Sequence, residues 1–350
     1  MAFREGNSGG DCGCCLPRRG VLAALVGGTA AAALGRGAVA AQPARRIVDV
    51  HAHYMPPELK ATGPQAGPMA TWTVAGHLAD MEKAGVARSL LSITTPGITG
   101  TGDRAQALVR SSNEYAARIC GDNPAKLGFF VYVRLDDIDW TLREIAYGLD
   151  VLKAQGVGLF TSYGNKWLGD PAFDPVFAEL ERRKAVVYVH PTTAACCSRL
   201  IPNVADTLIE YGTDTTRAIV SYVYRGAARR YPNVKMIWSH SAGTMPYLIE
   251  RFDVADAGAV AKAEAPQGFR AAAANFFYDV AQASNPVATG ALRKVVPMSQ
   301  IVFGTDYPFR TQLDHVRALD AGKVFNGAEL GALYRGNVER GLPSLLAAPG

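Results

Sequence analysis

Short β-rich apolar segments alternate with helical segments along the chain from Arg46 onward. Such alternation is typical of an α/β protein with a parallel sheet in which a helix follows each strand. Eight strands with this spacing favour a (β/α)8 barrel, the TIM barrel. We expect these strands at residues 47–50, 89–93, 127–133, 157–161, 186–190, 235–240, 276–280 and 301–306. Helices are expected between them, for instance at residues 75–84, 104–122, 140–154 and 175–184.

An open doubly wound sheet is the competing architecture, because periodicity alone does not separate the two. A nucleotide-binding sheet of that kind carries a Gly-rich phosphate turn after its first strand. No such turn follows residues 47–50. No internal repeat or low-complexity linker divides the chain after residue 40, so we expect a single barrel domain over residues 41–350.

The first 40 residues carry the features of an export signal. An apolar stretch of fourteen residues, 21–34, follows Arg18 and Arg19 and precedes the small residues Ala38 and Ala40. This order is typical of a twin-arginine signal peptide, with a Sec-type signal as the alternative because Pro17 precedes the arginines. The stretch is shorter than the roughly 20 residues that a bilayer-spanning helix needs. We therefore expect a signal peptide over residues 1–40, export to the periplasm and no stable membrane insertion.

Charge and cysteine content narrow the range of partners. The chain has 36 Lys and Arg against 31 Asp and Glu, and no run of five basic residues, so nucleic acid is not an expected partner. Beyond residue 40 the cysteines are Cys120, Cys196 and Cys197. An odd number with one adjacent pair does not indicate a disulfide framework.

Four of the six histidines lie at or directly after the ends of expected strands. His51 and His53 follow the first strand, and His190 and His240 end the fifth and sixth, while Asp306 ends the eighth. In a (β/α)8 barrel the C-terminal ends of the strands converge on the site of chemistry. Three imidazoles and a carboxylate form a good site for Zn²⁺ or a similar divalent ion.

The spacing of His51 and His53 fits this interpretation, because side chains two apart on a strand point to the same side. Each residue also has a structural explanation when taken alone. His190 is then a core histidine bonded to backbone, and His240 and Asp306 are helix caps. Their coincidence at matching strand ends favours the metal site. His77 and His315 lie within or at the start of expected helices and are interpreted as surface or packing residues.

These residues lie in motifs that resemble those of the amidohydrolase superfamily. More narrowly, the chain is similar to the branch that holds aminocarboxymuconate-semialdehyde decarboxylase and the salicylate-type decarboxylases, and most similar to its 6-methylsalicylate decarboxylase-like members. Residues 163–171, 214–218 and 334–337 carry this narrower likeness. The resemblance covers residues 46–345. The superfamily motifs are Val48-Asp49-Val50-His51-Ala52-His53, Val189-His190-Pro191, Ser239-His240-Ser241-Ala242-Gly243 and Gly304-Thr305-Asp306-Tyr307-Pro308.

The resemblance implies a role for each residue. It makes His51, His53, His190 and Asp306 the metal ligands, and His240 a catalytic histidine that mostly does not bind the ion. Binuclear members carry a carboxylated lysine on the fourth strand, and residues 157–161 contain none. The implied cofactor is therefore one divalent ion, Zn²⁺ with Mn²⁺ as the alternative.

The implied activity is non-oxidative decarboxylation of a small aromatic carboxylic acid of the salicylate type, a carboxy-lyase reaction in which Asp306 and His240 transfer protons. Metal-dependent hydrolysis of a lactone, ester or amide is the alternative within the same superfamily, and a non-catalytic exported binding protein is a third reading. The superfamily pattern is not matched throughout, because Ser241-Ala242-Gly243 stands where many members have a glycine pair.

An arginine completes the implied site. Arg251 lies eleven residues after His240, and decarboxylases of this branch carry an arginine at a similar distance. The resemblance therefore implies that Arg251 binds the carboxylate of an aromatic substrate across the interface of a homodimer. A surface ion pair of Arg251 with Glu250 or Asp253 is the alternative.

Overall fold

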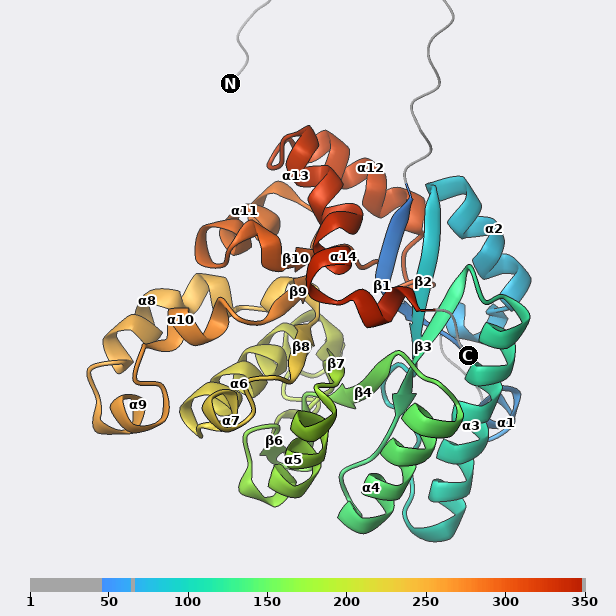
Figure 1. The fold of residues 1–350 in the computed structure, drawn as a ribbon, viewed down its shortest axis with the longest axis horizontal. Helices are drawn as coiled ribbons and strands as arrows, with labels where there is room; N and C mark the ends of the chain where they lie inside the picture. The colour runs from blue at the N-terminus through green and yellow to red at the C-terminus, as the bar shows by residue number, and fades with distance from the viewer. Residues whose placement is uncertain (1–45, 64–66, 348–350) are drawn as a thin grey trace, which may run out of the picture. The chain divides into compact units, whose positions relative to one another are not determined.

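The computed structural model describes residues 46–63 and 67–347, so the expected signal peptide lies outside the described residues. In the described residues eight strands form one sheet, and all neighbouring strands in it are parallel. Helices cover the outside of this sheet (Figure 1). The strands, in their order across the sheet, are β1 (Ile47–His53), β2 (Val86–Ser92), β3 (Leu127–Tyr132), β4 (Gly156–Phe160), β7 (Val186–His190), β8 (Lys235–Trp238), β9 (Phe277–Asp279) and β10 (Ile301–Val302).

Hydrogen bonds between the two ends of the sheet bring it close to a closed barrel. The Val50 amide donates to the Phe303 carbonyl at 3.0 Å, and the His53 amide donates to the Tyr307 carbonyl at 2.7 Å. Ala52 and Tyr307 form a parallel bridge. The expected (β/α)8 architecture is thereby confirmed.

Helix α2 (Val74–Ala84) begins and ends at residues that stabilise helix termini. The Thr73 side chain accepts a hydrogen bond from the Gly76 amide at the start of α2, and Gly85, with φ at 72°, ends that helix in the left-handed region. The longer helices are α2 (Val74–Ala84), α3 (Gly102–Asp122), α4 (Ile138–Ala146), α5 (Asp174–Arg183), α6 (Glu210–Tyr224), α8 (Met245–Ala255), α11 (Pro286–Val295) and α12 (Gln312–Gly322).

Shorter elements complete the described residues. A small antiparallel hairpin of β5 (Ser162–Tyr163) and β6 (Lys166–Trp167) follows β4. The short helices are α1 (Pro57–Lys60), α7 (Ala227–Arg230), α9 (Ala259–Glu264), α10 (Phe269–Ala273), α13 (Gly327–Gly331) and α14 (Asn337–Gly341). Within the described residues, none of the helices combines the length and the apolar character that crossing a bilayer requires.

The C-terminal segment covers one end of the barrel. Val338, Leu342 and Leu345 pack in one buried cluster with the strand residues Val48 and Val186. The buried Arg88 side chain at the start of β2 donates to the Leu345 carbonyl at 2.7 Å and to the Ala347 carbonyl at 2.6 Å. The N-terminal ends of the strands are therefore sealed, and the C-terminal ends are left for the site.

Three expected elements end earlier than their sequences indicate. The sixth strand stops at Trp238, because His240, Ser241 and Ala242 take φ values of 54°, 54° and 66° in the left-handed region. The eighth stops at Val302, and the backbone beyond it bonds to β1 instead. The helix expected over residues 140–154 ends at Ala146 and continues as a π-helical turn, Tyr147–Val151.

Candidate metal centre

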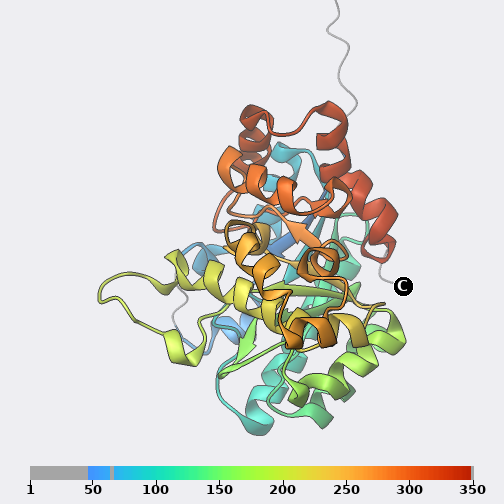
Figure 2. The ribbon, with the colours of Figure 1, turned by 90° about the vertical axis from the view of Figure 1, so that its left-hand side faces the viewer.

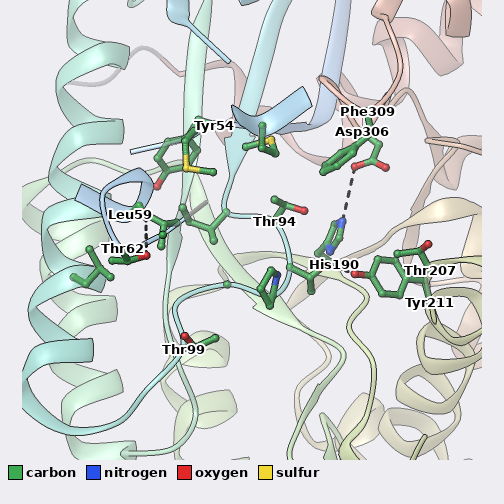
Figure 3. A pocket seen from close by; sticks show the side chains of 18 of the residues that line it. Tyr54, Leu59, Thr62, Thr94, Thr99, His190, Thr207, Tyr211, Asp306 and Phe309 are labelled. Carbon is green, nitrogen blue, oxygen red and sulfur yellow. Dashed lines mark hydrogen bonds and ion pairs between the residues drawn. The ribbon is translucent and has the colours of Figure 1, made fainter. Parts of the chain in front are cut away.

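The Asp306 carboxylate lies at the centre of the predicted site. Its Oδ1 atom is 2.8 Å from His53 Nε2, 3.3 Å from His51 Nε2 and 3.9 Å from His190 Nε2. The Nε2 atoms of His51 and His53 lie 3.2 Å apart, as expected for side chains two apart on β1. Figure 3 shows His190 pointing toward Asp306 from the opposite wall.

Each of the three imidazoles holds a hydrogen bond through its other nitrogen. His51 Nδ1 bonds to Asp279 Oδ2 at 2.9 Å, and His190 Nδ1 to the Pro191 carbonyl at 2.8 Å. His53 Nδ1 bonds to the Ser92 carbonyl at 3.2 Å. A carbonyl or an ionised carboxylate only accepts, so each Nδ1 carries a proton and each Nε2 is turned toward Asp306. There Nε2 donates to the carboxylate when it is protonated, and it offers a lone pair to a cation when the ring is neutral.

His240 faces the other oxygen of Asp306. Its Nε2 atom lies 3.6 Å from Asp306 Oδ2, and Gln282 Nε2 donates to the same oxygen at 3.1 Å. His240 Nε2 is buried and has no hydrogen-bond partner among the described residues. Oδ1 of the carboxylate therefore faces His51, His53 and His190, and Oδ2 faces His240.

The arrangement fits a divalent ion. Zn–N bonds of about 2.1 Å in a tetrahedral site place two ligand atoms about 3.4 Å apart, close to the spacings around Asp306 Oδ1. Lone pairs of neutral imidazoles that face one another repel unless a proton or a cation lies between them. One set of four potential ligand atoms, from His51, His190, His240 and Asp306, lies entirely within 4.8 Å of one another. His53 Nε2 also lies close to Asp306 Oδ1, at 2.8 Å, so five side chains are available to coordinate an ion.

Burial and charge shape the protonation of this cluster. Burial alone lowers the pKa of His51, but the carboxylates of Asp279 and Asp306 outweigh it and raise the pKa to about 10. Burial lowers the pKa of His190 to about 3 and also lowers that of His53. The pKa of Asp306 lies well below its ordinary value, because hydrogen bonds from the surrounding histidines outweigh its burial. An anionic, buried carboxylate among imidazoles attracts a cation.

The sequence pattern did not single out Asp279, which links two parts of the site. One oxygen accepts from His51 Nδ1, and the other accepts from the backbone amides of His240 and Ala281, each at 2.9 Å. Asp279 is the last residue of β9, so the same argument from strand ends would have found it. Gln282, three residues further on, adopts a φ of 51° that no local sequence signal predicts.

A cavity of about 1210 Å³ opens onto the cluster. His190, His240 and Asp306 line it, together with Tyr211 and Phe309 (Figure 3). Arg104 is the only lysine or arginine among the described residues that line it.

Two further segments border this cavity. The segment between β7 and α6, yellow-green in Figure 2, projects from the barrel and contributes Thr207 and Leu208 to the lining. The Tyr211 hydroxyl lies 2.6 Å from Thr95 Oγ1 and joins α6 to the loop after β2.

The structure brings five of the six predicted site residues together and leaves the sixth apart. Arg251 is exposed on α8 and does not line the cavity of its own chain. Asp253, one of its two suggested ion-pair partners, bonds instead to Arg270 at 2.7 Å. His77 and His315 are both fully buried and bond to Ser89 and Ser284, so they are packing residues.

Comparisons with known proteins agree with this geometry. The family described as Amidohydrolase matches residues 48–340. A 6-methylsalicylic acid decarboxylase of Penicillium expansum is 35% identical over 273 residues, which cover 75% of this chain and 84% of that protein. The chain belongs to the amidohydrolase family. The resemblance of the motifs to this family and to its decarboxylase branch is confirmed.

Solved structures of two decarboxylases share the fold. A 2,6-dihydroxybenzoate decarboxylase in complex with 2,6-dihydroxybenzoate aligns with a TM-score of 0.75 at 19% identity, over 86% of this chain and 99% of that chain. A 5-carboxyvanillate decarboxylase of Novosphingobium aromaticivorans, complexed with manganese and 4-hydroxy-3-methoxy-5-nitrobenzoic acid, aligns with a TM-score of 0.74 at 18% identity, over 85% and 96%.

Replacement of Asp279 by Asn tests its support of the metal site. An amide has one acceptor oxygen and one NH2 donor, so it cannot accept both from His51 Nδ1 and from the backbone amides of His240 and Ala281. Because such supporting carboxylates fix the tautomer of a ligand, we expect Asp279→Asn to lower the affinity for a divalent ion about 10- to 100-fold. Competition with a chelator measures this affinity. Asp103→Asn, on the exposed first turn of α3, is the matched control, and equal affinities in the two variants would contradict the role of Asp279.

Proposed function

We propose that this chain is a metal-dependent, non-oxidative decarboxylase of a small aromatic carboxylic acid of the salicylate type, a carboxy-lyase. One observation carries the proposal. Three histidine Nε2 atoms and one oxygen of Asp306 converge at a cavity, while the second oxygen faces His240. The sequence relative from Penicillium expansum, a 6-methylsalicylic acid decarboxylase, supports the same reaction class.

The reaction breaks the bond between the ring and the carboxylate. Carbon dioxide leaves, the ring carbon keeps the electron pair of that bond, and this carbon then takes up one proton. A bound divalent ion supplies charge stabilisation and orients the oxygens of the substrate. His51, His53, His190 and Asp306 are the residues that would hold it.

The proton is delivered by the groups on the open side of Asp306. His240 Nε2 and Asp306 Oδ2 lie 3.6 Å apart and both line the cavity, so a proton held by one is within reach of the other. Proton delivery by such a positioned group contributes typically 10²- to 10⁴-fold to a rate. Phe309 and Tyr211 flank the same part of the cavity and confine an aromatic ring there (Figure 3).

The identity of the ion is part of this proposal. Three imidazoles with one carboxylate are a donor set that suits Zn²⁺. Mn²⁺ is the alternative, supported by the manganese in the related 5-carboxyvanillate decarboxylase structure.

A panel of substrates tests the reaction class directly. We expect carbon dioxide release from hydroxybenzoates that carry the hydroxyl beside the carboxylate, and no release when the hydroxyl is moved to the opposite ring position. A parallel panel of lactones, esters and amides measures hydrolysis. Hydrolysis of these compounds without carbon dioxide release from any hydroxybenzoate would contradict the proposal and support the alternative activity.

Paired variants separate the ligands from His240. Because four other side chains remain to hold the ion, His240→Ala should keep one ion per chain and lose turnover by about 10²-fold or more. His51→Ala should lose the ion, since it removes a lone pair from the Oδ1 side. Elemental analysis of the two purified variants measures ion content. An equal loss of ion in both would make His240 a ligand.

We also propose that Arg251 binds the carboxylate of the substrate from a second subunit. Tyr247, Arg251 and Val254 share one face of α8, and the two apolar side chains are 88% and 73% exposed. Exposed apolar side chains beside an arginine favour a contact with a second copy of the chain. A guanidinium binds a carboxylate through two parallel hydrogen bonds.

Mixed dimers test this role. Arg251→Ala and His240→Ala subunits should each be inactive alone, and a mixture should regain activity, because each mixed dimer contains one pocket with both residues intact. Activity of the mixture at the level of the separate variants, in subunits shown by mass to have exchanged, would contradict a shared site. A monomeric wild-type chain would contradict it as well.

Export by the twin-arginine route is the last part of the proposal. It rests on Arg18 and Arg19 before the apolar stretch, and folding before transport would allow the ion to be bound in the cytoplasm. Replacing both arginines by lysine should retain the protein inside the cell, whereas Arg36→Lys, beyond the apolar stretch, should not. An unchanged periplasmic level of the double variant, measured by fractionation, would point to the Sec route.

A further inference from the structure

The cavity extends well beyond the groups that carry the chemistry. Figure 3 shows Tyr54, Leu59 and Thr62 gathered on one side, and His190, Asp306 and Phe309 on the other, with Thr94 between them. Cavities that bind drug-sized ligands are typically about 300–1,000 Å³. At about 1210 Å³ this one is larger still, and a benzoate with a single methyl group would leave most of it empty.

The end away from Asp306 is lined mainly by apolar side chains. Its lining, which we call the apolar arm, consists of Tyr54, Met55, Met69, Ile93, Ala105 and Leu108. These residues come from four segments, the ends of β1 and β2, the 3-10 turn Gly67–Thr71 and helix α3. A wall built from several rigid elements is preformed.

The apolar arm contains one polar side chain, Tyr54, and its hydroxyl already forms a hydrogen bond within the protein. The Tyr54 hydroxyl donates to the Ser112 carbonyl in α3 at 3.2 Å, so the ring contributes its apolar surface to the cavity. Tyr54, Met55, Met69 and Ile93 are at most 6% exposed, so the surrounding core holds them in place as a rigid wall of the cavity. Thr62 lies at the same end, and its hydroxyl donates to the Leu59 carbonyl at 2.8 Å. Arg104, which also lines the cavity, is exposed.

We propose that the substrate is a 2-hydroxybenzoate with an alkyl substituent of several carbons, and that the apolar arm binds this substituent. The inference rests on the proposed function, because it assumes that the hydroxyl and carboxylate lie at Asp306 and His240. The ring then occupies the space beside Phe309, and the substituent extends toward Tyr54 and Met69.

Binding of reaction products tests the inference without turnover. Decarboxylation of 6-alkyl- and 4-alkylsalicylates yields 3-alkylphenols, and that of 5-alkylsalicylates yields 4-alkylphenols. Burial of one methylene group favours binding by a factor of about four. We expect calorimetry with the metal-loaded enzyme to show affinities that rise about fourfold per carbon from methyl to pentyl in at least one of the two phenol series. Affinities that stay level or fall in both series would overturn the proposal.

Two variants at nearby positions of α3 test where the alkyl substituent binds. Ala105→Leu places extra carbons inside the apolar arm and should reduce the preference for pentyl over methyl at least tenfold. Ala107→Leu, on the exposed face of the same helix, should retain the preference. An undiminished preference in a folded Ala105→Leu enzyme would place the alkyl group elsewhere and overturn the assignment to the apolar arm. If Ala105→Leu does not fold, the phenol series with the wild-type enzyme still decides the question.

Carbon dioxide release from the matching salicylates separates this inference from the proposed function. Release from methylsalicylates, with level phenol affinities, would contradict the alkyl preference alone. No release from any salicylate, with a clear chain-length preference among the phenols, would contradict the decarboxylase proposal and not the binding role of the apolar arm.

Discussion

The site depends on one constraint, which is that the negative charge of a buried carboxylate must be balanced by hydrogen-bond donors or by a cation. Asp306 is 8% exposed and anionic, and an isolated charge so deep in a protein is strongly unfavourable. Four imidazoles surround it, and Asp279 and backbone carbonyls orient three of these through their Nδ1 atoms. This orientation turns each Nε2 toward the carboxylate, where it either donates a hydrogen bond or binds a cation. The cluster is therefore suited to a cation. The barrel holds its members at the ends of β1 and β7 and in the segments that follow β8 and β10.

The two oxygens of Asp306 face different groups. Oδ1 lies near the Nε2 atoms of three histidines, which are His51, His53 and His190. Oδ2 faces His240 and Gln282. This division matches the roles that we propose, in which Asp306 is a ligand and His240 beside it transfers protons. His240 and Asp306 both line the cavity, so the ring carbon of a bound aromatic acid would lie near the groups that we propose for proton transfer.

The fold was largely predictable from sequence because strand periodicity and buried apolar segments are local signals. The eight strands and the site residues on them follow from that pattern, since a parallel barrel brings strand ends together. The left-handed backbone at His240, Ser241, Gln282 and Asp306 was not predictable. It depends on tertiary contacts, such as the bond from the His240 amide to Asp279, that no local propensity encodes. Asp279 itself was predictable in principle, because it ends a strand that the sequence did indicate.

The central claim is that a single divalent ion, held by the Oδ1 cluster, makes this chain a decarboxylase. Titration of metal-free enzyme with Zn²⁺ or Mn²⁺, with bound ion and carbon dioxide release measured on the same samples, tests it most directly. We expect decarboxylation to rise in proportion to bound ion and to level off at one ion per chain. Full activity in the metal-free enzyme, or activity that appears only as a second ion binds, would contradict it.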